Sequence, residues 1–445
     1  ASPCSPSGGG GGDGAEGAEV DPRHFRNFEA LRWPPLLPST GAAQASTSPP
    51  AAPPPAVLVL GGSTFMGREL VQLLVARPAR VCVVNRGRKY WGTDDPSEGR
   101  AARLVADRRD AEGFARLLDE ATRRLGSRWD LVADFSAYNG RDIRAALAGL
   151  RGRFGRYAYI SSDSVYEVSA WAGDGWLPRR RADGAGEEEP CVAEADSARP
   201  ADKATQRRLR KAEDYGDRKL EAEEALAAGL AEHAAGSRGI ALRLPDVIGP
   251  FDDTFRLMAY WHWLHAGPEE PPQVPDARAA KRPRLEKKET DVEDPVPLSV
   301  VFSQDVARFI VALLDTDAPK DAPLCDAVNL ACEQQPDLRA FLGLLATAAR
   351  LPAPPKVVTK ARPKTFLPSV DRPWSLSCRR MLEVYRFAPT PLPEVLRCCA
   401  DWFEKACTEF PRDALRAAMK LPPGARKQAI QSAGLTCTPS SSSSS

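Results

Sequence analysis

The sequence predicts an α/β protein with a doubly wound parallel sheet, because two kinds of pattern alternate along the chain. Short apolar runs, typical of strands buried on both faces, are separated by stretches with the periodicity of amphipathic helices. Such alternation predicts a parallel sheet covered by helices on both sides, with ligands at the carboxyl ends of its strands. The runs that predict strands span residues 56–60, 80–84, 103–106, 131–133 and 157–160.

The composition of the chain excludes several classes of protein. Its 445 residues are 43% hydrophobic, which is enough to bury a sizeable core and excludes wholesale disorder. A net charge of +2 gives no case for a protein that coats nucleic acid, and without an 18-residue apolar run no membrane span is expected. Ten cysteines without a CxxC pattern and four histidines predict no metal site. We expect a reducing compartment, the cytoplasm first, with a nucleus or an organelle as alternatives.

Glycine and proline mark the parts that we expect to lie outside the folded unit. Residues 1–55 are predicted to be a disordered N-terminal tail, in which the aromatic stretch 25–37 could dock on the folded part. Two charged, loop-like stretches, at about 171–190 and 267–297, are predicted to be disordered surface insertions. Residues 411–445, which end in a poly-Ser run, are predicted to be a C-terminal tail.

The remaining chain divides into two parts. We predict a nucleotide-binding Rossmann domain at 56–250 and a smaller substrate lobe, mixed with returning sheet elements, at 251–410. The two parts together are the size of one nucleotide-binding domain with an appended lobe.

A glycine-rich turn joins the first predicted strand to the first predicted helix. Its glycines would let backbone N–H groups approach a pyrophosphate at the helix N-terminus, where side chains would block them. Thr64 stands at the middle position of the G-x-x-G-x-x-G pattern, and an ordinary βα turn is the alternative. The position between a buried strand and a helix favours a dinucleotide site. The predicted cofactor-binding turn comprises Gly61, Gly62, Thr64, Phe65, Met66 and Gly67.

The ends of the next strands carry further candidate cofactor residues. Asn85 stands where an NAD site usually has an acid for the ribose 2′-OH, and the following Arg86 would suit a 2′-phosphate. This favours NADP, with NAD as the alternative; an ordinary solvent-exposed arginine is the other interpretation of Arg86. Asp107 is placed to meet an adenine amine. After the fourth strand come Ser136, Ala137 and Tyr138, which we expect at the cofactor.

These motifs resemble the extended short-chain dehydrogenases/reductases of the NAD(P)-dependent epimerase/dehydratase family, over roughly residues 56–410. Thr64, Asn85-Arg86-Gly87 and Asp134-Phe135-Ser136-Ala137-Tyr138 are most similar to an atypical subgroup, which also resembles chloroplast stem-loop RNA-binding proteins. Beyond the turn and Asp107, the matching motifs are Ser161-Ser162-Asp163-Ser164-Val165-Tyr166, Tyr215-Gly216-Asp217-Arg218-Lys219, Leu242 to Pro250, Gln304 to Ala307 and Ala327 to Leu330.

Tyr215 and Lys219 form the predicted catalytic pair, because their i, i+4 spacing puts both on one side of a helix. A nearby ammonium should lower the pKa of the tyrosine, which can then exchange a proton with a carbinol while a nicotinamide exchanges the hydride. The resemblance implies that Lys219 also holds the nicotinamide ribose and that Ser162 bonds the substrate oxygen. It also places Asp163 where sugar-nucleotide dehydratases carry an acid. Those enzymes have Glu next, so Ser164 argues against dehydration.

We therefore expect an NAD(P)-dependent reductase or epimerase that acts on a sugar nucleotide or a related hydroxyl or carbonyl compound. By resemblance, the residues after Gly249-Pro250, including Asp252, Asp253, Phe255 and Arg256, line the substrate pocket. A homodimer is a further expectation.

The alternative is a non-catalytic NAD(P)-binding regulator or RNA-binding protein on the same fold. The basic runs at 207–211 and 281–288 could contact RNA phosphates, and the second also resembles a nuclear localisation signal. His262 and His265, at i and i+3 on a predicted helix, are expected to be packing residues.

Overall fold

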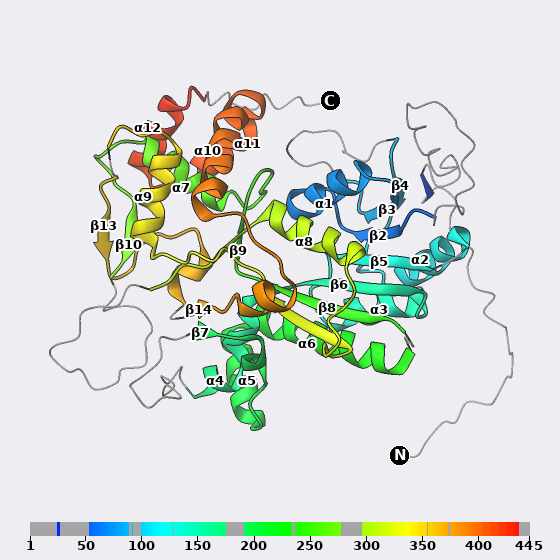
Figure 1. The fold of residues 1–445 in the computed structure, drawn as a ribbon. Helices are drawn as coiled ribbons and strands as arrows, with labels where there is room; N and C mark the ends of the chain where they lie inside the picture. Colours follow the sequence, from blue (N-terminus) through cyan, green and yellow to red (C-terminus); the bar gives the residue numbers. More distant parts are fainter. Residues whose placement is uncertain are drawn as a thin grey trace, which may run out of the picture.

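The computed structural model describes residues 25–26, 53–88, 91, 99–126, 128–174, 191–233, 236–276, 296–353, 355–372 and 374–435. An eight-stranded sheet in the order β1-β4-β3-β2-β5-β6-β8-β12 forms the centre (Figure 1). The seven strands from β4 to β12 are parallel, as predicted, and β1 pairs antiparallel with β4 at the edge. The strands are β1 (Phe25–Arg26), β2 (Ala56–Leu60), β3 (Arg80–Asn85), β4 (Ala102–Val105), β5 (Trp129–Asp134), β6 (Phe154–Ser162), β8 (Arg238–Leu244) and β12 (Cys325–Asn329).

Helices cover both faces of the sheet, because successive side chains of a strand point to opposite faces. Val57 and Val59 of β2 belong to the core under α1 and α8, whereas Leu58 and Leu60 belong to the core under α2, α3 and α6. The fold class predicted from the sequence is confirmed. The helices of this domain are α1 (Phe65–Val75), α2 (Ala111–Leu125), α3 (Gly140–Leu150), α4 (Ala170–Gly173), α5 (Lys203–Ala212), α6 (Asp214–His233) and α8 (Ser303–Asp315).

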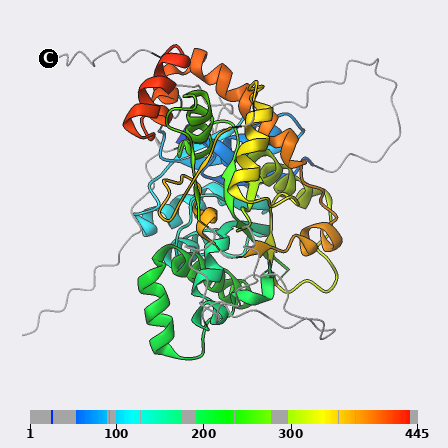
Figure 2. The ribbon, with the colours of Figure 1, turned by 90° about the vertical axis from the view of Figure 1, so that its left-hand side faces the viewer.

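A smaller lobe with its own apolar core lies beside the carboxyl ends of the strands (Figures 1 and 2). Its helices are α7 (Arg256–His265), α9 (Leu338–Ala348), α10 (Leu392–Glu409), α11 (Pro411–Ala418) and α12 (Pro423–Ser432). Paired short strands complete the structure: β10 (Gln273–Pro275) with β13 (Val358–Lys360), β9 (Asp246–Ile248) with β11 (Val300–Phe302), and β7 (Cys191–Val192) with β14 (Ser375–Leu376). Short 3-10 and π segments are η2 (Asp163–Val168), η3 (Glu194–Ser197), η4 (Pro368–Asp371) and η5 (Arg380–Val384).

The predicted C-terminal tail is wrong for residues 411–435. Helices α11 and α12 pack against α7, and Ala414, Ala417, Ala425 and Ala429 are completely buried. Small alanines let these helices approach their neighbours closely, although they add little to the apolar pattern of the sequence. The poly-Ser run lies outside the described residues.

The other predicted disordered segments are also shorter than expected. Phe25–Arg26, inside the predicted N-terminal tail, adds a strand to the sheet edge. At the start of the first predicted insertion, Trp171 of α4 is buried with its ring centroid 6.4 Å from that of Trp374. In the second predicted insertion, β10 forms a parallel pair with β13, which satisfies backbone hydrogen-bonding groups of this segment. Residues 175–190 and 277–295, which include the basic run 281–288, lie outside the described residues.

Candidate active site

A cleft with a volume of about 1030 Å³ lies at the carboxyl ends of the central strands, where the sheet faces the smaller lobe. It brings most of the predicted site residues together. Those that line it are Gly61, Gly62, Thr64, Phe65, Met66, Gly67, Asn85, Arg86, Asp107, Ser136, Tyr138, Ser162, Asp163 and Tyr215. Ala137 and Lys219 are buried behind the wall, where the Lys219 ammonium donates to the Ala137 carbonyl at 2.9 Å.

The glycine turn has the geometry that an anion cradle needs. Gly61 and Gly62 have φ angles of 118° and 83°, in the region that side chains disfavour. A Cβ on Gly67 would lie 2.7 Å from the backbone of Gly62, so only glycine fits where α1 begins. No acidic residue stands in the first turn of α1, and the positive end of its dipole favours an anion. The turn therefore fits a pyrophosphate.

Thr64, which replaces the middle glycine, ties this turn to the smaller lobe. It precedes α1 but makes no side-chain cap; instead its hydroxyl donates to the carbonyl oxygen of Phe251 at 3.1 Å. The Arg68 guanidinium lies 4.4 Å from the centroid of the Phe251 ring. The cofactor turn and the loop that leads into α7 are thus joined by two contacts.

The ends of β3 and β4 form a basic end of the cleft. Asn85 accepts a hydrogen bond from the Gly87 amide at 2.8 Å, and its buried Nδ2 has no protein partner. Arg86 is exposed and lines the cleft. The Asp107 carboxylate, expected to meet an adenine amine, is already held by Arg109, with Nη2 and Oδ2 2.5 Å apart. Hydrogen bonds from Arg109 lower the pKa of Asp107 to about 2.

Arg108 is a cleft residue that sequence reasoning missed. Its guanidinium binds both oxygens of the buried Asp134 carboxylate, each at 2.7 Å, and lies 4.8 Å from the Phe114 ring centroid. The Tyr157 hydroxyl donates to the same carboxylate at 2.5 Å. Burial alone would raise the pKa of Asp134, but Arg108 outweighs it and the pKa lies below its usual range. The signal in the sequence was Asp134 itself, because a carboxylate at the end of a buried apolar strand needs a cationic partner.

The predicted catalytic residues are together, but their electrostatics differ from the prediction. Tyr215 exposes 44% of its surface, and burial of its hydroxyl end, with Tyr138 and Asp163 nearby, raises its pKa to about 12. A hydrogen bond with Ser162 acts in the opposite direction. The predicted lowering of the Tyr215 pKa by Lys219 is therefore wrong for this structure. Lys219 is 5.8 Å from the Tyr215 ring centroid and bonds the Ala137 and Ile160 carbonyls at 2.9 and 2.8 Å.

Lys219 itself is perturbed. Burial lowers the pKa of its ammonium to about 8, because the charged form loses its hydration. The Tyr138 and Tyr159 rings, each with its centroid 5.0 Å from the Lys219 nitrogen, replace part of that hydration through cation–π contacts.

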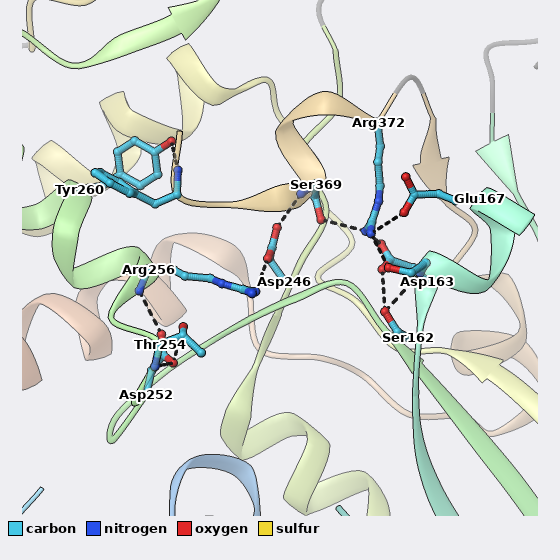
Figure 3. Close-up of polar contacts among 12 residues, drawn as sticks. Ser162, Asp163, Glu167, Asp246, Asp252, Thr254, Arg256, Tyr260, Ser369 and Arg372 are labelled. Carbon is cyan, nitrogen blue, oxygen red and sulfur yellow. Dashed lines mark hydrogen bonds and ion pairs between the residues drawn. The ribbon is translucent and has the colours of Figure 1, made fainter. Parts of the chain in front are cut away.

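Asp163 is part of a buried ion pair with Arg372, a residue 209 positions away (Figure 3). Arg372 also donates to the Ser164 hydroxyl at 2.7 Å and the Glu167 carboxylate at 3.0 Å. Burial raises the pKa of Asp163 to about 6, against the charge of Arg372. The Ser162 hydroxyl donates to Asp163 at 3.3 Å, so this carboxylate is engaged on both sides.

A second ion pair is joined to the first through Ser369, whose hydroxyl accepts from Arg372 at 3.4 Å (Figure 3). Asp246 accepts from Arg256 at 2.9 Å and from the Ser369 amide at 2.7 Å. Of the residues predicted to line the substrate pocket, Asp253 and Arg256 do so, whereas Asp252 and Phe255 are buried and are not among its lining residues. Asp252 instead fixes the loop, accepting bonds from the Thr254 amide and hydroxyl at 2.8 and 2.6 Å.

The remaining predicted features lie away from this cleft. His262 is buried and its Nε2 is 3.1 Å from the Ala414 carbonyl oxygen, which fits the predicted packing role. Within the described chain, no group of three or more His, Cys, Asp or Glu side chains could hold a metal ion. No helix in the same residues has the length and apolarity that crossing a bilayer requires. RNA binding by the run 207–211 on α5, whose basic side chains are exposed, stays a prediction, as does the homodimer.

The parallel sheet and the glycine cradle at its carboxyl edge define a Rossmann-type α/β protein, and solved structures share this fold. The UDP-glucose 4-epimerase of Thermus thermophilus, in complex with NAD, superposes with a TM-score of 0.53 at 19% identity, covering 79% of this chain and 99% of that one. The Thermotoga maritima UDP-glucose 4-epimerase with UDP-glucose superposes with a TM-score of 0.54 at 16% identity, covering 79% of this chain and 99% of that one.

A third neighbour is the UDP-glucuronic acid 4-epimerase of Bacillus cereus, in complex with UDP-glucuronic acid and NAD. It gives a TM-score of 0.52 at 15% identity, with 79% and 99% coverage. No known family model and no curated protein matches the sequence. These three structural neighbours are sugar-nucleotide 4-epimerases, two of them in complex with NAD, and their likeness confirms the fold over most of this chain.

Proposed function

We propose that this chain is an NAD(P)-dependent oxidoreductase of the epimerase type, which acts on a hydroxyl or carbonyl group of a sugar nucleotide or a related compound. One observation carries the proposal: a single cleft holds the glycine cradle at one end and Ser162 with Tyr215 further along. The neighbours of the same fold include complexes with NAD, UDP-glucose and UDP-glucuronic acid, which supports a dinucleotide and a sugar compound as ligands.

The residues present fit a dinucleotide. The turn at Gly61, Gly62 and Gly67 would hold the pyrophosphate by its backbone N–H groups. The unpartnered Nδ2 of Asn85 can donate to a ribose oxygen, and the exposed guanidinium of Arg86 can bind a 2′-phosphate. The bound cofactor supplies the hydride acceptor or donor.

Tyr215 is the proton donor in this proposal. Its raised pKa keeps the phenol protonated near neutral pH, so it can give a proton to a carbonyl oxygen as the carbonyl carbon accepts a hydride. The product is a carbinol, and the phenolate left behind is stabilised by Ser162 and by the charge of Arg256, the two groups that act to lower the Tyr215 pKa. The Ser162 hydroxyl, which acts to lower the Tyr215 pKa, would orient the same substrate oxygen.

The experiment that tests the proposal combines cofactor binding with turnover. Purified protein is titrated with NADPH and NADH, and then assayed with a panel of sugars, sugar nucleotides and simple carbonyl compounds. Saturable dinucleotide binding and a turnover that Tyr215→Phe removes are the expected results. The proposal fails if no dinucleotide binds, or if Tyr215→Phe turns over every substrate like the wild type.

A further inference from the structure

The substrate end of the cleft, defined here as its lining residues from Ser161 to Trp374, is strongly acidic. Two guanidinium groups, those of Arg256 and Arg372, face six carboxylates in this part of the described chain. The carboxylates are Asp163, Glu167, Glu213, Asp246, Asp253 and Asp371.

Both arginines already have carboxylate partners. Arg372 is bonded to Asp163 and Glu167, and is buried between them (Figure 3). Arg256 is bonded to Asp246 at 2.9 Å. A phosphate that displaced a carboxylate from either arginine would leave a buried charge uncompensated, which is costly. A phosphate that bound beside an intact pair would lie in a site whose carboxylates outnumber its arginines.

Three carboxylates form no ion pair with a side chain in the described part of the chain: Glu213, Asp253 and Asp371. The Glu213 side chain only accepts a backbone bond, from the Gly216 amide at 3.1 Å. Burial raises the pKa of Glu213 and the Glu167 charge raises it further, against the Gly216 hydrogen bond and the charge of Arg372. Burial also raises the pKa of Asp253. An added anion would raise these pKa values again, whereas hydrogen-bond donors would relieve them.

We propose that the substrate of this site is a polyhydroxy compound that carries no phosphate or carboxylate group, whose hydroxyls donate hydrogen bonds to Glu213, Asp253 and Asp371. An ionised carboxylate accepts hydrogen bonds and donates none, so hydroxyl groups match it and phosphate oxygens do not. The inference rests on the proposed function and narrows it: this chain takes a sugar or polyol without its nucleotide.

The test compares matched ligands on the full chain saturated with NADPH at pH 8. A set of common hexoses and pentoses is titrated calorimetrically, each as the unmodified sugar, the sugar 1-phosphate and the UDP-sugar. At least one unmodified sugar should bind at least tenfold more tightly than its phosphate and UDP forms. The inference is overturned if a UDP-sugar binds as tightly as its unmodified sugar, or if no unmodified sugar binds. If the full chain does not bind NADPH, the proposed function itself is contradicted.

Charge variants give the second arm of the test. The double variant Asp253→Asn/Asp371→Asn should bind UDP-sugars at least fivefold more tightly than the wild type, because two repelling charges are gone. Glu112→Gln, a change on α2 at a carboxylate whose side chain is 91% exposed, is the control and should not alter UDP-sugar affinity. Equal UDP-sugar affinities for the double variant, the control and the wild type would overturn the charge argument, and circular dichroism would verify that each variant is folded.

Discussion

The two ends of the cleft differ in charge although they share one cavity. From Gly61 to Asp142 the lining contains four arginines against two aspartates, whereas from Ser161 to Trp374 it contains two arginines against six carboxylates. The net charge of +2 for the whole chain conceals this difference. In the proposed function a dinucleotide would place its phosphates at the basic end, and the acidic end would select its ligand by hydroxyl groups. The charges of the two ends alone would therefore direct the two ligands to different parts of the cleft.

Removal of the Tyr215 hydroxyl, at the acidic end, should have the largest effect, because this hydroxyl is the proton donor of the proposed reaction. Tyr215→Phe should lower kcat by about 10²–10⁴-fold, the usual contribution of a positioned acid–base group. The dissociation constant of NADPH should stay within about twofold, since only a ring hydroxyl is lost. Steady-state kinetics and a cofactor titration check both values. Tyr159→Phe is the control, because it removes a hydroxyl that has no hydrogen-bond partner in the described structure. A comparable loss of kcat in that control would contradict the assignment.

The ion pair between Arg108 and Asp134 stabilises the fold at the basic end of the cleft. Asp134→Asn should destabilise the fold by about 3–5 kcal/mol, because the buried guanidinium loses its charged partner. The free energy of unfolding from urea denaturation measures this. Asp107→Asn breaks only an exposed pair, which solvent screens, and should cost much less. If the two variants lost equal free energy of unfolding, burial would not determine how much an ion pair stabilises this fold.

The same pair predicts a pH dependence. The pKa of Asp134 is lower in the folded chain than in an unfolded one, so its stabilisation is complete above the unfolded value and is lost as the pH falls through the folded value. The unfolding free energy of the wild type should therefore fall more steeply on acidification than that of Asp134→Asn. If the unfolding free energies of the two proteins fell in parallel with pH, the assigned role of the Asp134 carboxylate would be contradicted.

Arg86 should decide which dinucleotide the basic end prefers. Arg86→Ala should weaken NADPH binding by about tenfold, the loss of one charge-assisted contact, and NADH binding by much less. Fluorescence titrations with both cofactors measure the two changes. Arg116→Ala, on the exposed side of α2, serves as the matched control. A wild type that binds both dinucleotides equally would remove the NADP preference.

Thr64 should give the smallest effect, because it contributes one hydrogen bond between the two ends. Thr64→Gly should raise the KM of the substrate by about two- to tenfold, the usual value of such a bond, with little change in NADPH affinity. Thr64→Ser keeps the hydroxyl and should restore the wild-type KM. A Thr64→Gly variant that loses cofactor binding instead would show that Thr64 serves the turn rather than the loop.

The sequence predicts the basic end better than the acidic end. The strands and the glycine turn are predictable because buried strands are apolar runs and the turn follows one directly in the chain. Arg372 could not be assigned to Asp163, because only the folded chain brings together residues 209 positions apart. The direction of the Tyr215 pKa was missed for a related reason: the spacing to Lys219 is local, but burial depends on the whole cleft. Helices α11 and α12 were missed because their buried faces are alanines.

The most direct test is a fluorescence titration of the purified full chain with NADPH and NADH, repeated on Gly67→Ala. The wild type should bind NADPH saturably and more tightly than NADH. Gly67→Ala should lose binding of both, because the added Cβ would lie 2.7 Å from the Gly62 backbone inside the cradle. Absent binding in the wild type, or a folded Gly67→Ala that binds as the wild type does, would contradict the assignment of this cleft to a dinucleotide.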